Sequence, residues 1–181
     1  MVTLWKEAHH ERNGEQPADL IMLGAYTGAR IEELCSLKVK DVAEASFKIV
    51  DAKTDAGIRE VPTHSRIRGL VQRLKGSSKD DYLLSGLTFN KYGGRSNAIG
   101  KRLGRLKTSL GFGEQHVFHS LRKTLVILME NAGVPEGVAA DTVGHEKPTM
   151  TYGLYPGGAS LAVKAKAIEK AKYPFGSAAA A

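Results

Sequence analysis

The sequence has a single cysteine, Cys35, and this scarcity excludes two kinds of site. One thiol cannot form a disulfide within the chain, nor can it supply the cysteine set of a structural zinc site. A low cysteine content is typical of proteins that work in a reducing compartment, and we therefore expect a cytoplasmic protein.

Long hydrophobic runs are also missing. Apolar stretches such as LIML and LVILM are far shorter than the roughly 20 residues that cross a bilayer. The first residues, MVTLWKEAHHERNGEQ, mix charged and apolar side chains and lack the pattern of a secretory signal. The sequence therefore predicts neither a membrane span nor an export signal.

Motifs for nucleotides and metals fail on their spacing. Gly94 and Gly100-Lys101-Arg102 have five residues between the glycines and no Ser or Thr after the lysine, unlike a phosphate-binding P-loop. His9-His10-Glu11 lacks the register of a metalloprotease HExxH motif. We therefore expect no cofactor and no metal.

The sequence does carry an excess of positive charge on a chain of single-domain length. Its 181 residues can bury one substantial core. The formal net charge is +7 and the isoelectric point is about 9.5. Such a balance favours a polyanionic partner, although charge alone does not identify one.

Hydrophobic periodicity in the first half predicts helices around a small sheet. A helix is expected over 18–26, and a second opens near Arg30 after the Thr27-Gly28 break. Residues 46–51 and 58–62 alternate like the two strands of a hairpin, with its turn at 55–57. Further expected elements are a short third strand at Tyr82–Leu84 and a helix through Leu74 that is capped by Ser65.

The second half reads as entirely helical. Beyond the Gly93-Gly94 loop, the expected helices cover 96–109, 119–132, 136–143 and 159–172. We therefore predict an α+β fold that is mostly helical, with a small antiparallel sheet of about three strands. The terminal GSAAAA, residues 176–181, is of low complexity, and we expect it to be a disordered tail or a cloning scar.

Two pairs of residues can offer positive charge to an anion. His119 and Arg122 lie three apart on a predicted helix, so an imidazole and a guanidinium project from one face. Arg30 opens a helix, where free backbone N–H groups favour anions, and Glu33 is placed one turn on to orient it. Each pair alone is also consistent with ordinary surface residues.

Four further residues complete the candidate set. Lys53 lies near the tip of the predicted hairpin, from which it can reach over a bound strand and donate a proton. His145 follows a glycine, and Tyr152 and Tyr155 lie in the exposed stretch YGLYPGG. A phenol has a pKa near 10, so as a nucleophile it needs cationic neighbours or a base.

The stretch 100–107 of the helix predicted over 96–109 is strongly basic. Its charges come from Lys101, Arg102 and Arg105, with Lys107 beyond them. Such a face can follow a nucleic-acid backbone, and it can equally be a solvated helix surface.

Taken together and in this order, these residues resemble one family, the tyrosine recombinases or phage-type integrases. The resemblance covers about Ala18 to Gly158 and is carried by TGARIEELCSLKVKDV, AKTDAGIREVPTH, HSLRKT and VGHEKPTMTYGLYPGG. The last segment is similar in style to prophage integrases. The resemblance implies the fold of a tyrosine-recombinase catalytic domain, with double-stranded DNA as the partner.

The resemblance also implies roles for the cationic residues. Arg30 and Arg122 would clamp the non-bridging oxygens of the scissile phosphate, with Glu33 supporting the first arginine. His145 would donate a hydrogen bond to a phosphate oxygen.

The chemical steps implied by the resemblance need no metal and no ATP. A tyrosine would attack the phosphate, giving a 3′-phosphotyrosyl link and a free 5′-hydroxyl. His119 would assist proton transfer at the nucleophile, and Lys53 would protonate the departing 5′-oxygen. A 5′-hydroxyl from another strand would then reverse the step and join new partners, which is site-specific recombination.

The nucleophile can be either of two tyrosines. Family members usually place it nine or ten residues after the second histidine. Tyr155 stands ten residues after His145 and Tyr152 only seven, so we favour Tyr155.

The resemblance implies a larger assembly than this chain. We expect residues 1–175 to be the catalytic domain, without the amino-terminal core-binding domain that family members carry. A homotetramer on synapsed DNA is implied. The last helix, with a stripe of Leu161, Ala165 and Ile168, would dock on a neighbouring protomer or pack on its own core.

Two rival functions remain open. A type IB topoisomerase shares the arginine, lysine, histidine and tyrosine chemistry but relaxes DNA alone. A non-catalytic DNA-binding module on the same fold would have no need of a positioned tyrosine.

Overall fold

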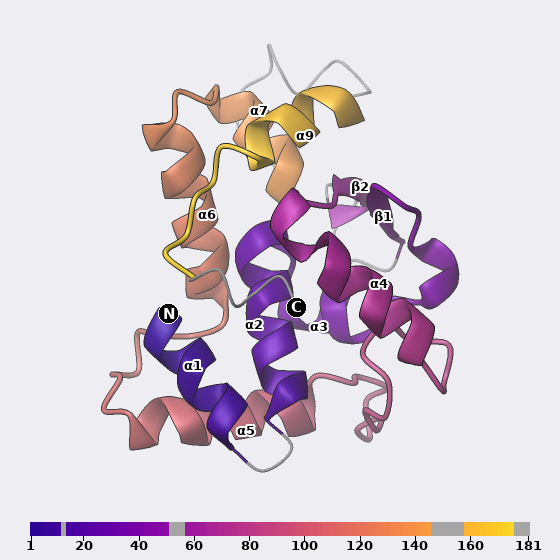
Figure 1. Cartoon of the computed structure of the whole chain (residues 1–181), viewed down its shortest axis with the longest axis vertical. Helices are drawn as coiled ribbons and strands as arrows, with labels where there is room; N and C mark the ends of the chain where they lie inside the picture. Colours follow the sequence, from indigo (N-terminus) through magenta and orange to yellow (C-terminus); the bar gives the residue numbers. More distant parts are fainter. Residues whose placement is uncertain (12–13, 51–56, 146–157, 176–181) are drawn as a thin grey trace.

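The chain opens with two helices joined by a short connection. The computed structural model describes residues 1–11, 14–50, 57–145 and 158–175 (Figure 1). The first helix, α1 (Val2–His10), packs on α2 (Glu15–Thr27) through Trp5 and Ala8. No helix was expected at α1, because its few apolar side chains give a weak period among charged residues.

Helix α2 is the centre of the core. Every residue from Pro17 to Thr27 is buried, so the helix is covered on all sides, as its apolar sequence requires. It contacts α1, α5 (Asn97–Ser109), α6 (His119–Asn131) and α3 (Ile31–Cys35). The predicted helix over 18–26 is confirmed, with an extra turn at its start.

The sheet has two strands among the described residues. Strand β1 (Ser46–Ile49) pairs antiparallel with β2 (Arg59–Pro62), with Ser46 opposite Pro62 and Ile49 opposite Arg59. Phe47, Ile49 and Val61 are buried against the core. The predicted hairpin strands are therefore confirmed, with slightly shorter bounds.

The third strand expected at Tyr82–Leu84 is wrong. Tyr82 makes only an isolated bridge to Lys38, and it pairs with neither β1 nor β2. The residue before it, Asp81, has a φ of 63°, so the chain turns where an extended strand would have to begin.

The remaining elements follow the predicted order. Among them the helix expected after Ser65 is split into a 3-10 turn and an α-helix. Its cap is His64 rather than Ser65, because the His64 Nδ1 accepts the Arg66 N–H at 3.0 Å while the Ser65 hydroxyl bonds Glu169. These elements are η1 (Val39–Asp41), η3 (Ser65–Ile67), α4 (Arg68–Ser77), α7 (Glu136–Val143) and α9 (Leu161–Ile168).

The last helix packs within its own chain. Helix α9 contacts α7 and β2, and its buried Lys164 donates to the Glu60 carbonyl at 2.6 Å. Beyond it, the Tyr173 hydroxyl donates to the Ala25 carbonyl at 2.7 Å and so ties the tail to α2. Of the two alternatives for this helix, the structure describes the one in which it packs on its own core.

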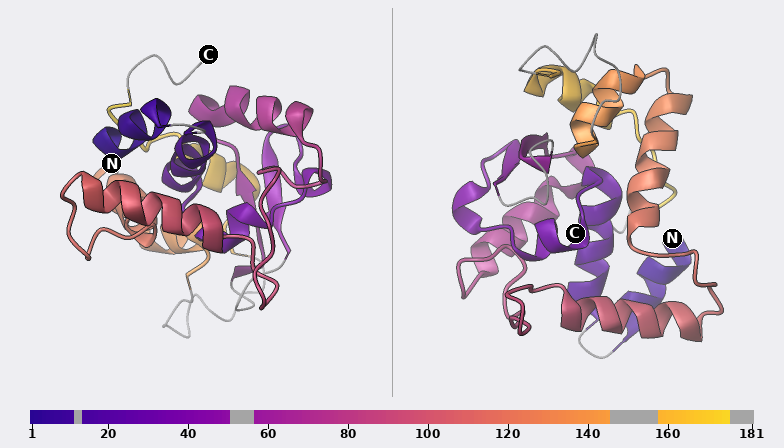
Figure 2. Two further views of the ribbon diagram at one scale, coloured as in Figure 1. Left: turned by 90° about the horizontal axis from the view of Figure 1, so that it is seen from below. Right: turned by 180° about the vertical axis from the view of Figure 1, so that it is seen from behind.

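The helices divide the molecule into two ends. Helix α5 crosses one end beside α1 and α2, while α7 and α9 lie at the other (Figures 1 and 2). The sheet and α4 form a flank beside α2 and α3 (Figure 1). Within the described ranges, no helix has the length and apolar character to cross a membrane.

Gly28, at the end of α2, lies where α2 and α7 approach each other closely. Its φ is +61°, and a Cβ there would lie 2.7 Å from the Val143 Cγ1. We expect Gly28→Ala to lower the free energy of unfolding by about 2 to 4 kcal/mol, because it adds strain and a clash. Denaturant unfolding measures this change.

The matched control is Gly69→Ala on the exposed side of α4, where an added Cβ meets nothing within 4 Å. Alanine should there raise the free energy of unfolding by about 0.5 to 1 kcal/mol, since glycine is a poor helix former. Equal effects at both positions would contradict the close approach at Gly28.

Candidate active site

The candidate site begins at the turn between α2 and α3. The Thr27 hydroxyl donates to the Leu23 carbonyl at 2.6 Å and accepts the Ala29 N–H at 3.1 Å, which fixes the chain as it leaves α2. Gly28 then turns the backbone, so that Arg30 becomes the N-cap of α3. The Arg30 side chain is 34% exposed, so this turn presents a partly accessible guanidinium.

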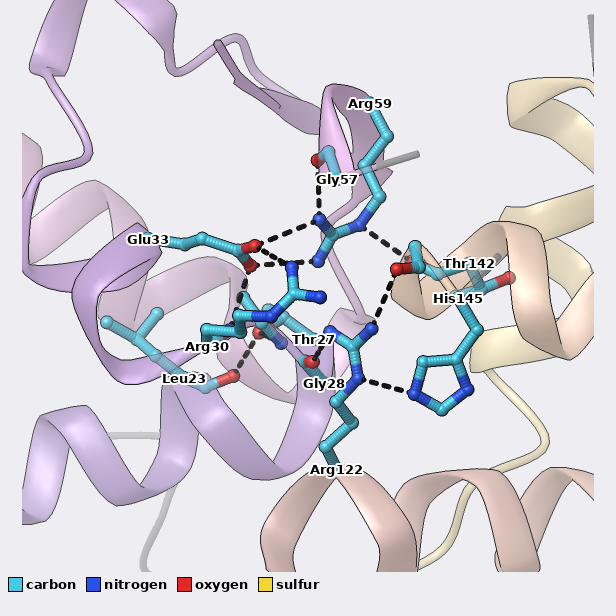
Figure 3. Close-up of polar contacts among 12 residues, drawn as sticks. Leu23, Thr27, Gly28, Arg30, Glu33, Gly57, Arg59, Arg122, Thr142 and His145 are labelled. Carbon is cyan, nitrogen blue, oxygen red and sulfur yellow. Dashed lines mark hydrogen bonds and ion pairs between the residues drawn. The ribbon is translucent and has the colours of Figure 1, made fainter. Parts of the chain in front are cut away.

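Glu33 is a buried carboxylate that receives four donors. Its Oε2 accepts the Arg30 backbone N–H at 2.8 Å, the glutamate half of a capping box. Its Oε1 lies 2.6 Å from the Arg30 Nη1 (Figure 3). The Arg59 Nη2 reaches Oε2 at 3.1 Å, and its Nη1 lies 3.5 Å from Oε1.

This environment keeps Glu33 ionised. Burial alone would raise its pKa, but the charge and hydrogen bonds of Arg59 and Arg30 outweigh burial and lower the pKa below the ordinary value. The carboxylate is therefore a permanent negative charge between two arginines.

Arg59 was not among the residues predicted from the sequence. It is the first residue of β2, its side chain is 5% exposed, and it also donates to the carbonyls of Gly57 and Thr142. A charged residue in a strand usually faces solvent, so nothing in the alternation pattern pointed inward. Its place in the segment AKTDAGIREVPTH, six residues after the predicted hairpin lysine, was the signal that could have identified it.

Arg122 is the most buried cation of the site. It projects from α6, is 1% exposed, and donates to the carbonyls of Gly28 at 2.9 Å and Gly144 at 3.0 Å (Figure 3). Both glycines are left-handed C-caps, of α2 and α7, and helix C-termini carry partial negative charge. Two helix ends therefore stabilise a guanidinium that has no carboxylate partner among the described residues.

Burial and nearby positive charge both destabilise the protonated form of Arg122. Burial, followed by the charges of Arg59 and Arg30, lowers its pKa to about 10. The described cluster contains three arginines and one ionised glutamate, Glu33, so it carries an excess of two positive charges. A dianionic or monoanionic group placed here would relieve that repulsion.

Two histidines border this cationic cluster. The His145 Nε2 accepts the Arg122 Nε–H at 3.1 Å, which requires a neutral imidazole with its proton on Nδ1. Burial and the charge of Arg122 lower the pKa of His145 below its ordinary value. His119 is the first residue of α6, and burial with the charges of Arg122, Lys123 and Arg30 lowers its pKa too.

The structure thus brings together five of the residues that the sequence singled out. Glu33 is bonded to Arg30, Arg122 lies close enough to feel the charges of Arg30 and Glu33, and His145 is bonded to Arg122. His119 lies close enough to feel the charges of Arg122 and Arg30. Lys53, Tyr152 and Tyr155 lie outside the described residues.

The basic stretch 100–107 lies on α5, which passes next to the start of α3. A Cβ on Gly100 would lie 3.6 Å from Ile31, the residue after Arg30. Lys101 and Arg105 are exposed, four residues apart on one face of α5, while Arg102 is half-buried. The Glu32 carboxylate accepts the backbone N–H groups of Arg95 and Ser96 and so anchors the beginning of α5 to α3.

The described residues of the site are suited to binding an anion. Within residues 1–11, 14–50, 57–145 and 158–175, no group of His, Cys, Asp and Glu could hold a metal ion. What the geometry supplies is fixed guanidinium donors and two imidazoles with lowered pKa, which suit a phosphate group and proton transfer near it.

Comparison with known proteins gives consistent matches. Residues 1–157 match the model of the phage integrase family. The integrase of Staphylococcus phage L54a is 26% identical over 165 residues, which cover 76% of this chain and 47% of that protein. The chain therefore spans about half the length of this curated relative.

Solved structures agree on the fold. The integrase of mycobacterium phage Brujita has a TM-score of 0.67 at 17% identity, covering 94% of this chain and 56% of that one. The Tn1549 transposon integrase, solved with circular intermediate DNA, has a TM-score of 0.64 at 21% identity, covering 84% of this chain and 60% of that one.

The coupling between arginines and histidines can be tested by titration. Arg30 is one of the charges that lower the pKa of His119 and His145, so Arg30→Gln should raise both values. Imidazole NMR signals followed over about pH 5 to 8 report these pKa values. Arg73→Gln, which removes a cation paired with Asp19 on another face, should leave both unchanged. Unaltered titration of both histidines in Arg30→Gln would refute the coupling.

Proposed function

Because this chain belongs to the phage integrase family, the tyrosine recombinases, we propose that it cleaves and rejoins DNA strands through a covalent phosphotyrosyl link. Membership of the family supports site-specific DNA recombination in general. The observation that supports the mechanism is a cluster of three arginines and one carboxylate, in which Arg30 and Arg59 bond Glu33 and Arg122 bonds His145. The cluster has an excess of positive charge and two adjacent histidines.

The scissile phosphate would bind at the accessible side of this cluster. Arg30 has the exposed guanidinium and would engage a non-bridging oxygen. The Arg122 Nε–H, which the His145 imidazole now accepts, would pass to a phosphate oxygen, because an anionic acceptor makes the stronger bond. His145, released from Arg122, would then turn to the phosphate as a hydrogen-bond donor.

The bond changes balance without a cofactor. The Tyr155 oxygen attacks phosphorus as its proton leaves with the help of His119, and the bond to the 5′-oxygen breaks. Lys53 protonates that oxygen, which departs as a 5′-hydroxyl. The lowered pKa of His119 keeps its imidazole neutral near pH 7 and able to accept a proton. Attack by a 5′-hydroxyl from another strand reverses the sequence.

The proposed partner is double-stranded DNA. The Tn1549 integrase was solved with DNA, and here the exposed Lys101 and Arg105 lie on α5, whose Gly100 approaches Ile31, the residue after Arg30. We further propose that the chain acts in the cytoplasm as the catalytic part of a larger protein. It would work as a tetramer on synapsed DNA, together with an amino-terminal DNA-binding domain.

The nucleophile is tested by trapping on a nicked suicide DNA substrate that loses the attacking 5′-hydroxyl. Tyr155→Phe should abolish the covalent protein–DNA adduct, because it removes the attacking oxygen. Tyr152→Phe is the matched control and should form the adduct at a rate close to the wild type. Gel mobility under denaturing conditions detects the adduct.

The reverse pattern would move the nucleophile to Tyr152. An adduct in neither the wild type nor the control would favour the non-catalytic DNA-binding module. Relaxation of supercoiled DNA without strand exchange between two duplexes would instead favour the topoisomerase.

The role of α5 is tested by salt-dependent binding. Lys101→Ala and Arg105→Ala should each weaken DNA binding irrespective of sequence and lower the slope of log affinity against log salt by about 1. The control is Lys166→Ala, an exposed lysine on α9 at the opposite end of the molecule (Figure 1). Fluorescence anisotropy at several salt concentrations measures the slope, and equal slopes for all three variants would exclude α5 from the interface.

A further inference from the structure

Arg59 is a buried cation whose contacts join three separate segments of the chain. Its Nη1 donates to the Gly57 carbonyl at 2.7 Å, and its Nη2 bonds Glu33 on α3 at 3.1 Å. Its Nε lies 3.3 Å from the Thr142 carbonyl at the end of α7 (Figure 3). With a side chain only 5% exposed and its donors engaged by protein, Arg59 cannot itself grip a DNA phosphate.

We propose that Arg59 is a positioning residue that keeps Arg30 directed toward the scissile phosphate, an inference that rests on the proposed function of Arg30. Arg59 acts through the carboxylate that the two arginines share. Its Nη2 occupies Oε2 of Glu33 and its Nη1 lies 3.5 Å from Oε1, so the Arg30 guanidinium bonds Oε1 through Nη1 only. Glu33 therefore holds the Arg30 guanidinium at one point and leaves its other donors available.

Removing Arg59 would change how the two oxygens of Glu33 are bonded. A carboxylate and a guanidinium pair most strongly through two parallel hydrogen bonds. Without Arg59, the Oε2 of Glu33 keeps only the Arg30 backbone N–H, and the carboxylate can turn to grip the Arg30 side chain with both oxygens. Arg30 would then be drawn inward from the side where the phosphate binds.

The fold should survive this loss, because Glu33 still has Arg30 as its counter-ion. A buried ion pair is most damaged when one charge is left without a partner, and that does not happen here. The consequence of losing Arg59 should therefore fall on the chemistry rather than on folding.

The test compares cleavage rates of wild type and Arg59→Met on suicide DNA with three kinds of scissile group. These are an ordinary phosphate, a methylphosphonate that lacks one negative charge, and a phosphate with sulfur in place of the leaving 5′-oxygen. On ordinary DNA we expect Arg59→Met to cleave about 100-fold more slowly with unchanged DNA affinity, the loss typical of a small misplacement. On methylphosphonate DNA the ratio of wild-type to variant rates should shrink at least tenfold, because a neutral group depends less on an arginine clamp. Sulfur should leave the ratio unchanged.

Two variants make the outcome specific. Arg59→Lys keeps the charge but not the planar fork, and it should show the same pattern with a smaller loss. Arg68→Met removes an exposed arginine at the start of α4 and should cleave all three substrates like the wild type.

Each other result overturns the inference. An equal rate loss on all three substrates would mean a merely structural role, and rescue by sulfur alone would mean that Arg59 acts on the leaving group. Wild-type rates in Arg59→Met would mean that Arg59 is dispensable. Should Arg59→Met fail to fold, Arg59→Lys is read by the same criteria. Failure of the proposed function is distinguishable, because the wild type itself would then form no tyrosine adduct.

Discussion

Glu33 keeps an ionised carboxylate at 4% exposure, and a charge buried so deeply is tolerated only when donors surround it. Four donors from Arg30 and Arg59 meet that condition and fix the carboxylate in one orientation. The Glu33 side chain therefore positions the start of α3, the first residue of β2 and the accessible guanidinium of Arg30. The other features of the site are arranged around this point.

Arg122, unlike Glu33, is a buried charge whose partners in the described part of the chain are not oppositely charged side chains. It is held by carbonyl groups at the C-terminal ends of α2 and α7, where Gly28 and Gly144 turn the chain in left-handed conformations. Carbonyl dipoles stabilise a guanidinium without neutralising it. The site therefore keeps its excess positive charge, which a glutamate in the same place would have cancelled, and that excess is what a phosphodiester can use.

The sequence predicted elements that depend on neighbours along the chain better than residues whose contacts depend on distant segments. The period of apolar residues correctly predicted α2, α5, α6 and α7 and both hairpin strands, because these depend on neighbours along the chain. The third strand failed because the left-handed Asp81 interrupts it, and α1 was missed because its buried face is only Trp5 and Ala8. Arg30, Glu33 and Arg122 were found through spacing and resemblance, whereas Arg59 has meaning only once β2 is packed beside α3.

Helix α3 connects two parts of the molecule although it is short. It has five residues, too few to be stable alone, and its two adjacent glutamates bond different segments of the chain. Glu32 accepts the backbone N–H groups of Arg95 and Ser96 and so fixes the start of α5, whereas Glu33 fixes Arg30 and Arg59. One helical turn thus sets the distance between the basic face of α5 and the arginine cluster. Because a DNA backbone has a fixed spacing of phosphates, the proposed DNA binding along α5 and the proposed chemistry at Arg30 would be geometrically coupled through these two carboxylates.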